Sequence, residues 1–572
     1  MIETIESNRY PSADELIAQN VASRIHAKDA TLYNFSDNAE EFARNYMGWT
    51  QLATNPPYPI ADIESFAQEM EERGIKTVLL IGQGGSTQAP MTLTKYNKVD
   101  SNKVSFKTLD SVNPVRVRAI LADCDPQTTL VIQSSKSGGT IEPSLVTEAV
   151  EKLLASQLSE EELGDHFIAI TDPGSDLEKK AADKGWMKVF NGEPTVGGRY
   201  SALSVFGLVP AACVGINLET LMDRARAAEN LCASDSVDNP AIVLASFLYD
   251  NLQRGRDKFS FLSPKRGRVL GLWIEQLVAE SLGKEGQGIL PNIEVDSLTL
   301  SDDPGDRTVI VYHTKTDLWD ERENFHKSLE FINPAIPQLD FTVETVYDLA
   351  EHFVMWEYAI AMVGYLMKVC PFDQPDVQVA KTEVLSILAD GAPDPTFVQE
   401  GIEGVAVGKV EVHVSKALEP YMFRHTLDEA INALLESIKP GDFFSINAFL
   451  PFTGEGRREA MEEVRHSLSD RYGVASCLEI GPRYLHSTGQ LHKGGPNEGV
   501  FLVISAEETR DIEVEDPRAE SLGELAKAQA LGDFSILSER GRRCLHVHLP
   551  DNSAITLRTL AKALRKGVAK QR

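Results

Sequence analysis

Short apolar runs, each followed by a loop or a helical segment, constrain the fold of this chain more than any other feature. The runs do not alternate between apolar and polar residues, which is typical of strands buried on both faces. They span residues 77–81, 129–132, 167–170 and 188–190. Helical patterns at 144–158 and 176–184 lie between some of them. This order predicts parallel βαβ units, in which ligands bind beyond the carboxyl ends of the strands.

The same alternation continues further along the chain. Strands are expected at 258–262 and 308–312, and helices at 269–282 and 345–369. Beyond about residue 385 we expect strands at 442–446, 474–478, 499–504 and 543–547, with helices at 427–438, 457–472 and 522–531. The sequence therefore predicts an α/β protein with two doubly wound parallel-sheet domains and a further lobe. The expected parts are an N-terminal helical extension (1–60), a first domain (61–240), a second domain (241–384) and a C-terminal α/β lobe (385–572).

Net charge argues against some binding partners, and cysteine content indicates the cellular location. The net charge of −29 would repel nucleic acids and anionic membranes, so we expect neither as a partner. An anionic ligand would need a locally positive pocket. The six cysteines are far apart and form no Cys-x-x-Cys pair, which indicates reduced thiols and a cytoplasmic location. The N-terminus lacks the apolar core of a signal peptide, and the most apolar stretch, 202–216, is too short and broken to span a bilayer.

Two polar loops follow neighbouring predicted strands. The first reads Ile81-Gly-Gln-Gly-Gly-Ser-Thr87, and the second reads Ser134-Ser-Lys-Ser-Gly-Gly-Thr140. Glycines let backbone N–H groups approach an anion, while the hydroxyls and the lysine add donors, so both loops suit a phosphate group. The alternative interpretation is a pair of structural turns with an incidental lysine.

Together the two loops resemble the phosphate-binding signature of the sugar-isomerase (SIS) fold. The resemblance implies that Ser135, Ser137 and Thr140 bind phosphate, that Lys136 assists, and that Gly85 and Ser86 lie near sugar hydroxyls. SIS domains occur in regulators as well as in enzymes. At this point the resemblance names a small-molecule sugar phosphate as the ligand and does not name a reaction.

A third motif, Gly197-Gly-Arg-Tyr-Ser201, resembles the signature of the phosphoglucose isomerase family. That family interconverts glucose 6-phosphate and fructose 6-phosphate through a cis-enediol(ate), with no cofactor and no metal, and its members suggest a homodimer. By the resemblance, Arg199 stabilises the intermediate. An arginine stays charged, and its planar fork fixes the direction of its hydrogen bonds.

Two further motifs extend the resemblance. Glu280, in Glu280-Ser-Leu-Gly-Lys284, matches the catalytic base of the family. Without the family it would read as an ordinary solvent-facing helical residue, and Glu275 or Glu285 would look as plausible. Gln374 and Lys381, in Phe372-Asp-Gln-Pro-Asp-Val-Gln-Val-Ala-Lys381, keep the family spacing. Gln374 is expected to bind substrate, and Lys381 is expected to help open the sugar ring.

The histidine that assists ring opening in most family members has no counterpart in its usual sequence context. The candidates are His313, His326 and His352, together with His486 and His492 in the C-terminal lobe. The last two lie, with Lys493, in the glycine-rich motif Leu478-Glu-Ile-Gly-Pro-Arg-Tyr-Leu-His-Ser-Thr-Gly-Gln-Leu-His-Lys-Gly-Gly-Pro-Asn497. This motif resembles the isomerase half of bacterial transaldolase–phosphoglucose isomerase fusion proteins, a resemblance that covers roughly 60–572. It could bind an anion, replace the missing histidine or form a rigid turn. Residues 1–60 are too few for a transaldolase barrel, so we expect no transaldolase activity.

Two alternatives remain open. The same base could serve both epimers at C2, giving a dual phosphoglucose and phosphomannose isomerase. A non-catalytic SIS regulator that binds a sugar phosphate is the other. A regulator has no need to keep Arg199, Glu280, Gln374 and Lys381 together, so their joint presence favours an enzyme.

Overall fold

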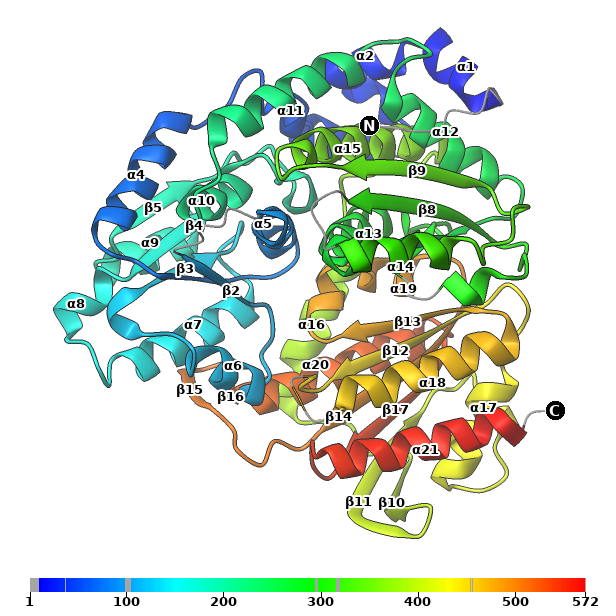
Figure 1. The fold of residues 1–572 in the computed structure, drawn as a ribbon. Coiled ribbons are helices and arrows are strands. Elements are labelled where there is room, and N and C mark those ends of the chain that lie inside the picture. The colour runs from blue at the N-terminus through cyan, green and yellow to red at the C-terminus, as the bar shows by residue number, and fades with distance from the viewer. Residues whose placement is uncertain are drawn as a thin grey trace. The chain divides into compact units, whose positions relative to one another are not determined.

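The computed structural model describes residues 10–36, 38–97, 104–293, 297–314, 319–452, 454 and 456–570. The chain forms two compact units. The first comprises residues 1–110, 123–284 and 288–374, and the second comprises 111–122, 285–287 and 375–572. Three parallel or largely parallel sheets organise the two units (Figure 1). The expected α/β fold class is confirmed, whereas the domain boundaries at 60, 240 and 384 stay predictions.

The first sheet of the first unit has five parallel strands. Their order is β2 (Ser105–Leu109), β1 (Thr77–Ile81), β3 (Thr129–Ser134), β4 (Phe167–Thr171) and β5 (Lys188–Asn191). The strand order reverses between β1 and β3, and such a switch point is where α/β sheets bind their ligands. Ile81 pairs with Gln133, so the two polar loops leave the sheet side by side.

A second parallel sheet follows in the same unit. Its order is β7 (Leu290–Asn292), β6 (Lys258–Leu262), β8 (Arg307–Thr314) and β9 (Gln338–Val343). The helices of this unit are α1 (Pro11–Ala18), α2 (Val21–His26), α3 (Ala39–Tyr46), α4 (Ile60–Glu72), α5 (Gly85–Tyr96), α7 (Ile141–Leu154), α8 (Glu160–Gly164), α9 (Asp176–Asp183), α10 (Val205–Cys213), α11 (Leu218–Cys232), α12 (Pro240–Leu252), α13 (Arg268–Leu282), α14 (Trp319–Leu329) and α15 (Asp348–Met367).

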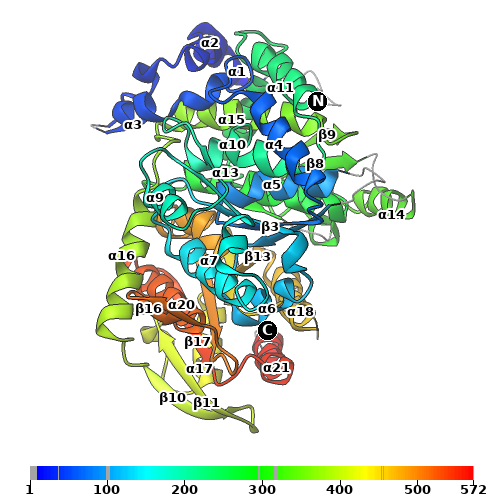
Figure 2. The ribbon, with the colours of Figure 1, turned by 90° about the vertical axis from the view of Figure 1, so that its left-hand side faces the viewer.

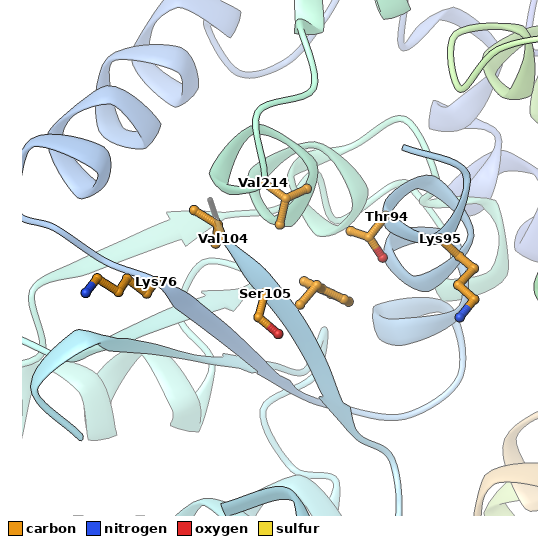
Figure 3. Close-up of a pocket in the computed structure, with 7 residues that line it drawn as sticks. Lys76, Thr94, Lys95, Val104, Ser105 and Val214 are labelled. Carbon is orange, nitrogen blue, oxygen red and sulfur yellow. The ribbon is translucent and has the colours of Figure 1, made fainter. Parts of the chain in front are cut away.

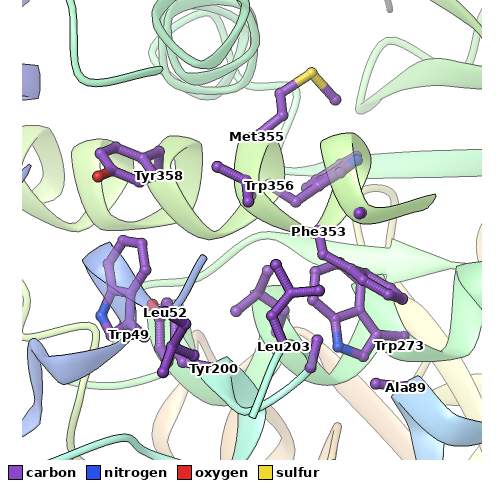
Figure 4. Packing of buried hydrophobic residues seen from close by; sticks show 14 of the residues in the cluster. Trp49, Leu52, Ala89, Tyr200, Leu203, Trp273, Phe353, Met355, Trp356 and Tyr358 are labelled. Atoms are coloured by element: carbon purple, nitrogen blue, oxygen red, sulfur yellow. The ribbon is translucent and has the colours of Figure 1, made fainter. Parts of the chain in front are cut away.

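An aromatic cluster in the core of the first unit supports the Gly-Gly-Arg-Tyr-Ser turn. The ring of Trp49 stacks on Tyr200 at 4.9 Å and meets Tyr358 of α15 edge-on at 5.1 Å (Figure 4). All three rings are almost fully buried. Tyr200 is tightly packed in this core. The backbone of the preceding residue, Arg199, is therefore held in one position.

The second unit contains a six-stranded sheet. Its order is β10 (Phe397–Ile402), β11 (Val405–Val414), β17 (Arg543–Leu549), β14 (Gly499–Ala506), β12 (Phe443–Phe449) and β13 (Ala475–Ile480). The last four strands are parallel, while β10 and β11 are antiparallel additions at one edge. A small antiparallel pair, β15 (Glu513–Asp516) and β16 (Ala519–Ser521), lies outside this sheet.

The helices of the second unit cover both faces of its sheet. They are α6 (Pro114–Leu121), α16 (Pro375–Asp390), α17 (Leu427–Glu436), α18 (Arg457–Tyr472), α19 (Gly489–Gly494), α20 (Leu522–Glu539) and α21 (Ala554–Lys570). Leucine, isoleucine and valine side chains of one sheet face pack with those of α17, α18 and α21 in a single core. Helix α20 packs against β14 and β17. Among the helices described, none is long and apolar enough to cross a membrane.

Candidate active site

Two helix N-termini meet at the switch point of the first sheet. Helix α5 begins at Gly85, after the short loop that follows β1, and α7 begins just after Thr140. Gly84 has a positive φ of 54°, a conformation that favours glycine and lets the loop turn into α5. The positive ends of two helices at one edge of the sheet suit an anion. The two loops therefore lie at one edge of the sheet, and phosphate binding by them stays a prediction.

The serines and threonine of the second loop line its turn. Ser135 is buried, and its Oγ lies 3.4 Å from Oγ1 of Thr140. Ser137 is exposed, and its Oγ accepts a hydrogen bond of 3.3 Å from the backbone N–H of Gly139. These contacts within the loop help to hold its shape just before α7.

Lys136 is paired with a carboxylate that lies outside its own loop. Its Nζ lies 2.6 Å from Oδ2 of Asp172, directly after β4, and donates a 3.0 Å hydrogen bond to the carbonyl of Glu193. Burial lowers the pKa of Lys136 and raises the pKa of Asp172. Asp172 lies outside the loop and compensates the charge of the lysine, a partner that the loop motif alone does not indicate. A direct role of Lys136 in phosphate binding stays a prediction.

The first loop touches the Gly-Gly-Arg turn. A Cβ added to Gly85 would lie 1.9 Å from the carbonyl oxygen of Gly198, so only glycine allows this approach of two backbones. Ser86, the next residue, is buried. Packing thus explains why Gly85 is a glycine, and it brings the loop after β1 next to Arg199. The expected contacts of Gly85 and Ser86 with sugar hydroxyls stay untested.

Arg199 lies in a one-turn 3₁₀ helix, Gly198–Tyr200, and its side chain is 3% exposed. Its Nε donates to Oγ of Ser281 at 2.7 Å, and one terminal nitrogen donates to Oε1 of Gln374 at 2.8 Å. The other terminal nitrogen donates to the carbonyl oxygens of Pro371 (2.6 Å) and Asp373 (2.9 Å). Four hydrogen bonds therefore fix the plane of the guanidinium group.

Glu280 lies in the last turn of α13 and is buried, with 8% of its surface exposed. The sequence without its family context would have placed it in solvent. One carboxylate oxygen lies 3.6 Å from Arg199, and the other accepts a 3.0 Å hydrogen bond from Nε2 of Gln276. A carboxylate oriented by an amide and held near a fixed cation is suited to moving a proton beside a developing negative charge.

Sequence reasoning missed the residues that hold this arrangement. Gln276 lies one helical turn before Glu280, and that spacing alone could have suggested the contact. Lys284, 2% exposed, donates to Oδ1 of Asp373 at 2.5 Å and to the carbonyl of Cys370 at 2.7 Å. Burial lowers the pKa of Lys284. Because this lysine ties the end of α13 to residues 370–373, it also fixes the carbonyl groups that accept from Arg199.

The predicted site residues fall into different parts of the molecule. Gln374 belongs to the first unit and contacts Arg199, as described above. Lys381 lies on α16 in the second unit and is half-buried. The role expected for Lys381 therefore rests on its sequence motif alone.

Two histidine candidates of the first unit lie together. The rings of His313, near the carboxyl end of β8, and of His326, on α14, are 5.4 Å apart. Nε2 of His313 lies 2.8 Å from Oδ1 of Asp340. His352, in contrast, is fully buried, contacts Tyr312, and has its pKa lowered to about 4 by burial. A group that loses its proton so far below neutrality is poorly suited to a proton shuttle at neutral pH.

The candidates in the second unit differ from each other in burial. His486 ends a short 3₁₀ helix and is half-buried. His492, on α19, is 1% exposed, and its ring packs against Phe501 (4.9 Å) and Tyr484 (5.9 Å). Burial lowers the pKa of His492 to about 3, which counts against the shuttle role.

A pocket elsewhere in the first unit does not coincide with this chemistry. It has a volume of about 460 Å³ and lies near the amino ends of β1 and β2, opposite to the edge that carries the loops. Its two lysines, Lys76 and Lys95, extend their amino groups to opposite sides (Figure 3). They do not converge on a common anion. In the described part of the chain, no cluster of three or more His, Cys, Asp or Glu side chains could hold a metal ion.

Comparisons with known proteins place the chain in a family. The family model described as phosphoglucose isomerase matches residues 66–296. The glucose-6-phosphate isomerase of Mycoplasmopsis pulmonis is 30% identical over 390 residues, which cover 60% of this chain and 90% of that protein. This chain belongs to the phosphoglucose isomerase family. A probable glucose-6-phosphate isomerase of Methanococcus maripaludis is 28% identical, covering 54% of this chain and 78% of its own length.

Solved structures support the fold of a phosphoglucose isomerase family member. A glucose-6-phosphate isomerase from Chlamydia trachomatis superposes with a TM-score of 0.55 at 17% identity, covering 68% of this chain and 87% of that one. A hypothetical protein from Thermus thermophilus gives 0.56 at 23% identity, covering 68% and 100%. The closer resemblance to the isomerase half of transaldolase fusion proteins stays a prediction.

Proposed function

We propose that this chain catalyses the reversible isomerisation of D-glucose 6-phosphate and D-fructose 6-phosphate. Membership of the phosphoglucose isomerase family, whose relatives carry the name glucose-6-phosphate isomerase, supports the reaction. The observation that carries the chemistry is the buried Glu280 carboxylate, which lies 3.6 Å from a guanidinium group fixed by four hydrogen bonds.

That geometry supports proton transfer between C1 and C2 by Glu280. Glu280 removes the proton from C2 of the open-chain aldose, and the electrons move to give a cis-enediolate. The same carboxyl group returns the proton to C1, while the hydroxyl proton on O2 passes to O1 and the C2–O bond becomes a carbonyl, which yields the ketose. Arg199 stabilises the negative charge on the enediolate oxygens, because it is held in place before that charge develops.

Binding and ring opening complete the proposal. The helix N-termini after β1 and β3 hold the phosphate through backbone N–H groups, with Ser135, Ser137 and Thr140 as further donors. Lys381 assists the opening of the cyclic sugar, with His313 or His326 as the candidate histidine in the first unit. A cytoplasmic location and a homodimer, as the family resemblance implies, belong to the same proposal.

The direct test is conversion of fructose 6-phosphate to glucose 6-phosphate, followed with a coupled dehydrogenase in the presence of EDTA. We expect turnover that the chelator does not reduce. Tight sugar-phosphate binding without turnover would contradict the proposal and favour a regulator. Parallel assays with mannose 6-phosphate show whether the enzyme also accepts the C2 epimer.

A further inference from the structure

The loop after β13 in the second unit, residues 481–495, is conspicuous in the sequence and has no part in the chemistry described above. We call it the α19 loop, because it contains α19. Its side chains are strongly buried, and Gln490 at its centre has no exposed surface. A buried amide needs hydrogen-bond partners, and the identity of those partners indicates what the loop does.

Gln490 caps the first turn of α16, the helix that carries Lys381. Its Oε1 accepts a 3.0 Å hydrogen bond from the backbone N–H of Asp376, and its Nε2 donates at 2.8 Å to Oδ2 of the same residue. Arg540 donates to the other carboxylate oxygen at 2.6 Å. N–H groups in the first turn of a helix have no partner within the helix, so they need one from elsewhere. Pro375, the first residue of α16, has no N–H, and Gln490 satisfies the next one.

The α19 loop also holds the segment that follows the Glu280 motif. The carbonyl oxygen of Gly494 accepts a 2.9 Å hydrogen bond from the N–H of Gly286. Gly286 has a positive φ of 74° and lies two residues after Lys284. Within the second unit, the α19 loop therefore contacts both the start of α16 and the short segment 285–287.

The α19 loop is itself rigidly supported. Arg542 donates to the carbonyl oxygens of Lys493 (2.8 Å) and Gly495 (2.7 Å). The ammonium group of Lys493 pairs with Asp533 of α20 at 2.5 Å, and Tyr484 donates to the same carboxylate at 2.6 Å. A buried network whose members are hydrogen-bonded to one another resists displacement.

Helix α16 also packs along α20 of the same unit (Figure 2). A Cβ added to Gly532 of α20 would lie 3.1 Å from Cγ2 of Val384, so the glycine permits a close approach of the two helices. The cap at Asp376 fixes one end of α16, and this packing fixes its axis. Lys381 lies between the two restraints.

We infer that Gln490 is a positioning residue for the isomerisation, acting through α16 on Lys381. The inference rests on the proposed function and extends it, because it gives the C-terminal lobe a part in the reaction. Removing the cap frees the first turn of α16 and lets the Lys381 ammonium group move away from its productive position. Small displacements of a reacting group cost large factors in rate, on the order of 100-fold for about 1 Å.

The test compares Gln490→Leu with a matched control, Gln399→Leu. Gln399 also lies in the second unit and also accepts from the first N–H of a helix, Leu427 of α17, at 2.9 Å, while donating to Gly401 at 3.0 Å. We expect Gln490→Leu to lower kcat about 10- to 100-fold. The affinity for an acyclic phosphorylated aldonic acid, which imitates the enediolate and needs no ring opening, should stay within about threefold of wild type. Gln399→Leu should leave both values unchanged.

A rescue experiment separates positioning from a general loss of stability. The variant Gln490→Glu places a second carboxylate opposite that of Asp376, so the two acceptors repel each other. The variant Asp376→Asn places an amide N–H donor opposite another donor, either Nε2 of Gln490 or Arg540. The double variant restores the pattern with the roles exchanged, because the asparagine amide donates to the new glutamate and its oxygen still accepts from Arg540. We expect both single variants to lose kcat and the double variant to recover most of it.

The outcomes distinguish this inference from the proposed function. An inactive wild-type enzyme would overturn the proposed isomerisation and the inference with it. An active wild type with a fully active Gln490→Leu variant, or equal losses in Gln490→Leu and Gln399→Leu, would overturn the positioning role alone. Faster hydrogen exchange at the first turn of α16 in Gln490→Leu, and not in Gln399→Leu, is the expected structural signature.

Discussion

Two buried charged clusters, one in each unit, use similar side chains in different ways. In the first unit, Glu280 accepts one hydrogen bond from Gln276 and keeps its other oxygen 3.6 Å from Arg199, beyond hydrogen-bond length. In the second unit, the Asp533 carboxylate accepts from Lys493, Tyr484 and Asn447 at once. A carboxylate with capacity left over can take part in a reaction, whereas one that is saturated by its neighbours holds the fold together.

The six-stranded sheet of the second unit carries further buried polar residues that contact one another. His546 and His548 on β17 both contact Oγ of Ser505 at 2.8 Å, and Nε2 of His548 lies 3.2 Å from Glu507. His413 pairs with His546 across the neighbouring strand. These polar groups contact one another, and the rings of His413 and His546 pack against Phe534 of α20. Burial of titratable residues alone therefore does not identify an active site.

The largest effect is expected for Glu280→Gln in the first unit. The amide cannot accept a proton, so kcat should fall on the order of 10³- to 10⁴-fold. Binding of an acyclic phosphorylated aldonic acid should stay close to wild type, because the phosphate loops are unchanged. The measurement is the coupled assay together with calorimetric titration. Near-wild-type turnover would show that Glu280 is not the base. Its role would then not differ from the structural role of Asp533.

Asp533→Asn in the second unit should instead lower stability. The change leaves the Lys493 ammonium group buried without its carboxylate, at a cost of about 3–5 kcal/mol. Adding Lys493→Met should recover most of that loss, as measured by the melting transition. The control is Asp176→Asn, whose exposed pair with Lys179 should contribute less than about 1 kcal/mol. A melting temperature unchanged in Asp533→Asn would show that the buried pair is not structural.

The pH dependence of stability provides a third, smaller test. Burial lowers the pKa of His413 to about 4 from its ordinary 6.5, with His546, His548, Glu411 and Lys527 as its charged or titratable neighbours. Between pH 6.5 and about pH 4, His413 is protonated in the unfolded chain and neutral in the folded chain. The stability of the folded chain therefore falls as the pH drops from 6.5 towards 4. The loss at pH 5 is about 2 kcal/mol.

Replacing His413 with glutamine should therefore reduce the loss of stability as the pH drops below 6.5. The exposed His425→Gln variant serves as the control. Melting temperatures measured at pH 7 and pH 5 are sufficient for the comparison. An identical slope in wild type and His413→Gln would show that His413 is not held in its neutral form by the fold.

The smallest expected effect concerns Lys136, whose charge is compensated by Asp172. Lys136→Met should raise KM about tenfold, because the unpaired Asp172 carboxylate then repels the substrate phosphate. The variant Lys136→Met/Asp172→Asn should return KM towards wild type. A double variant as impaired as the single one would show that the ammonium group contacts the phosphate directly.

Most central strands were predicted well, and so were the edge strands β5 and β13, whereas the edge strands β2, β7, β9 and β10 were not expected. β1, β3 and β4 are buried throughout and mostly apolar, because both of their faces are covered, and they were expected within a few residues of their true ends. β2 reads Ser-Phe-Lys-Thr-Leu with an exposed start, and β9 alternates between buried and partly exposed residues. Edge strands are covered on fewer sides, so their apolar signal is weak.

The candidate active site was also predicted only in part from the sequence. Motifs located Arg199, Glu280 and the two loops, because those residues follow strands or end helices in recognisable contexts. The partners that orient them, such as Asp172 for Lys136 and Asp373 for Lys284, lie 36 and 89 positions away in the chain. Contacts over such distances depend on the three-dimensional packing, which no local pattern encodes. The pairing of Gln490 with Asp376, 114 positions apart, was out of reach for the same reason.

The central claim is that Glu280 moves a proton through an enediolate, and isomerisation in D₂O tests it most directly. A carboxyl group that holds the proton during the enediolate lifetime exchanges it with solvent in part of the turnovers. The account predicts that some of the product carries deuterium at its newly formed C–H bond, and that Glu280→Gln forms no such product. Rapid turnover with no deuterium in the product would indicate direct hydride transfer between C1 and C2 and would contradict the account.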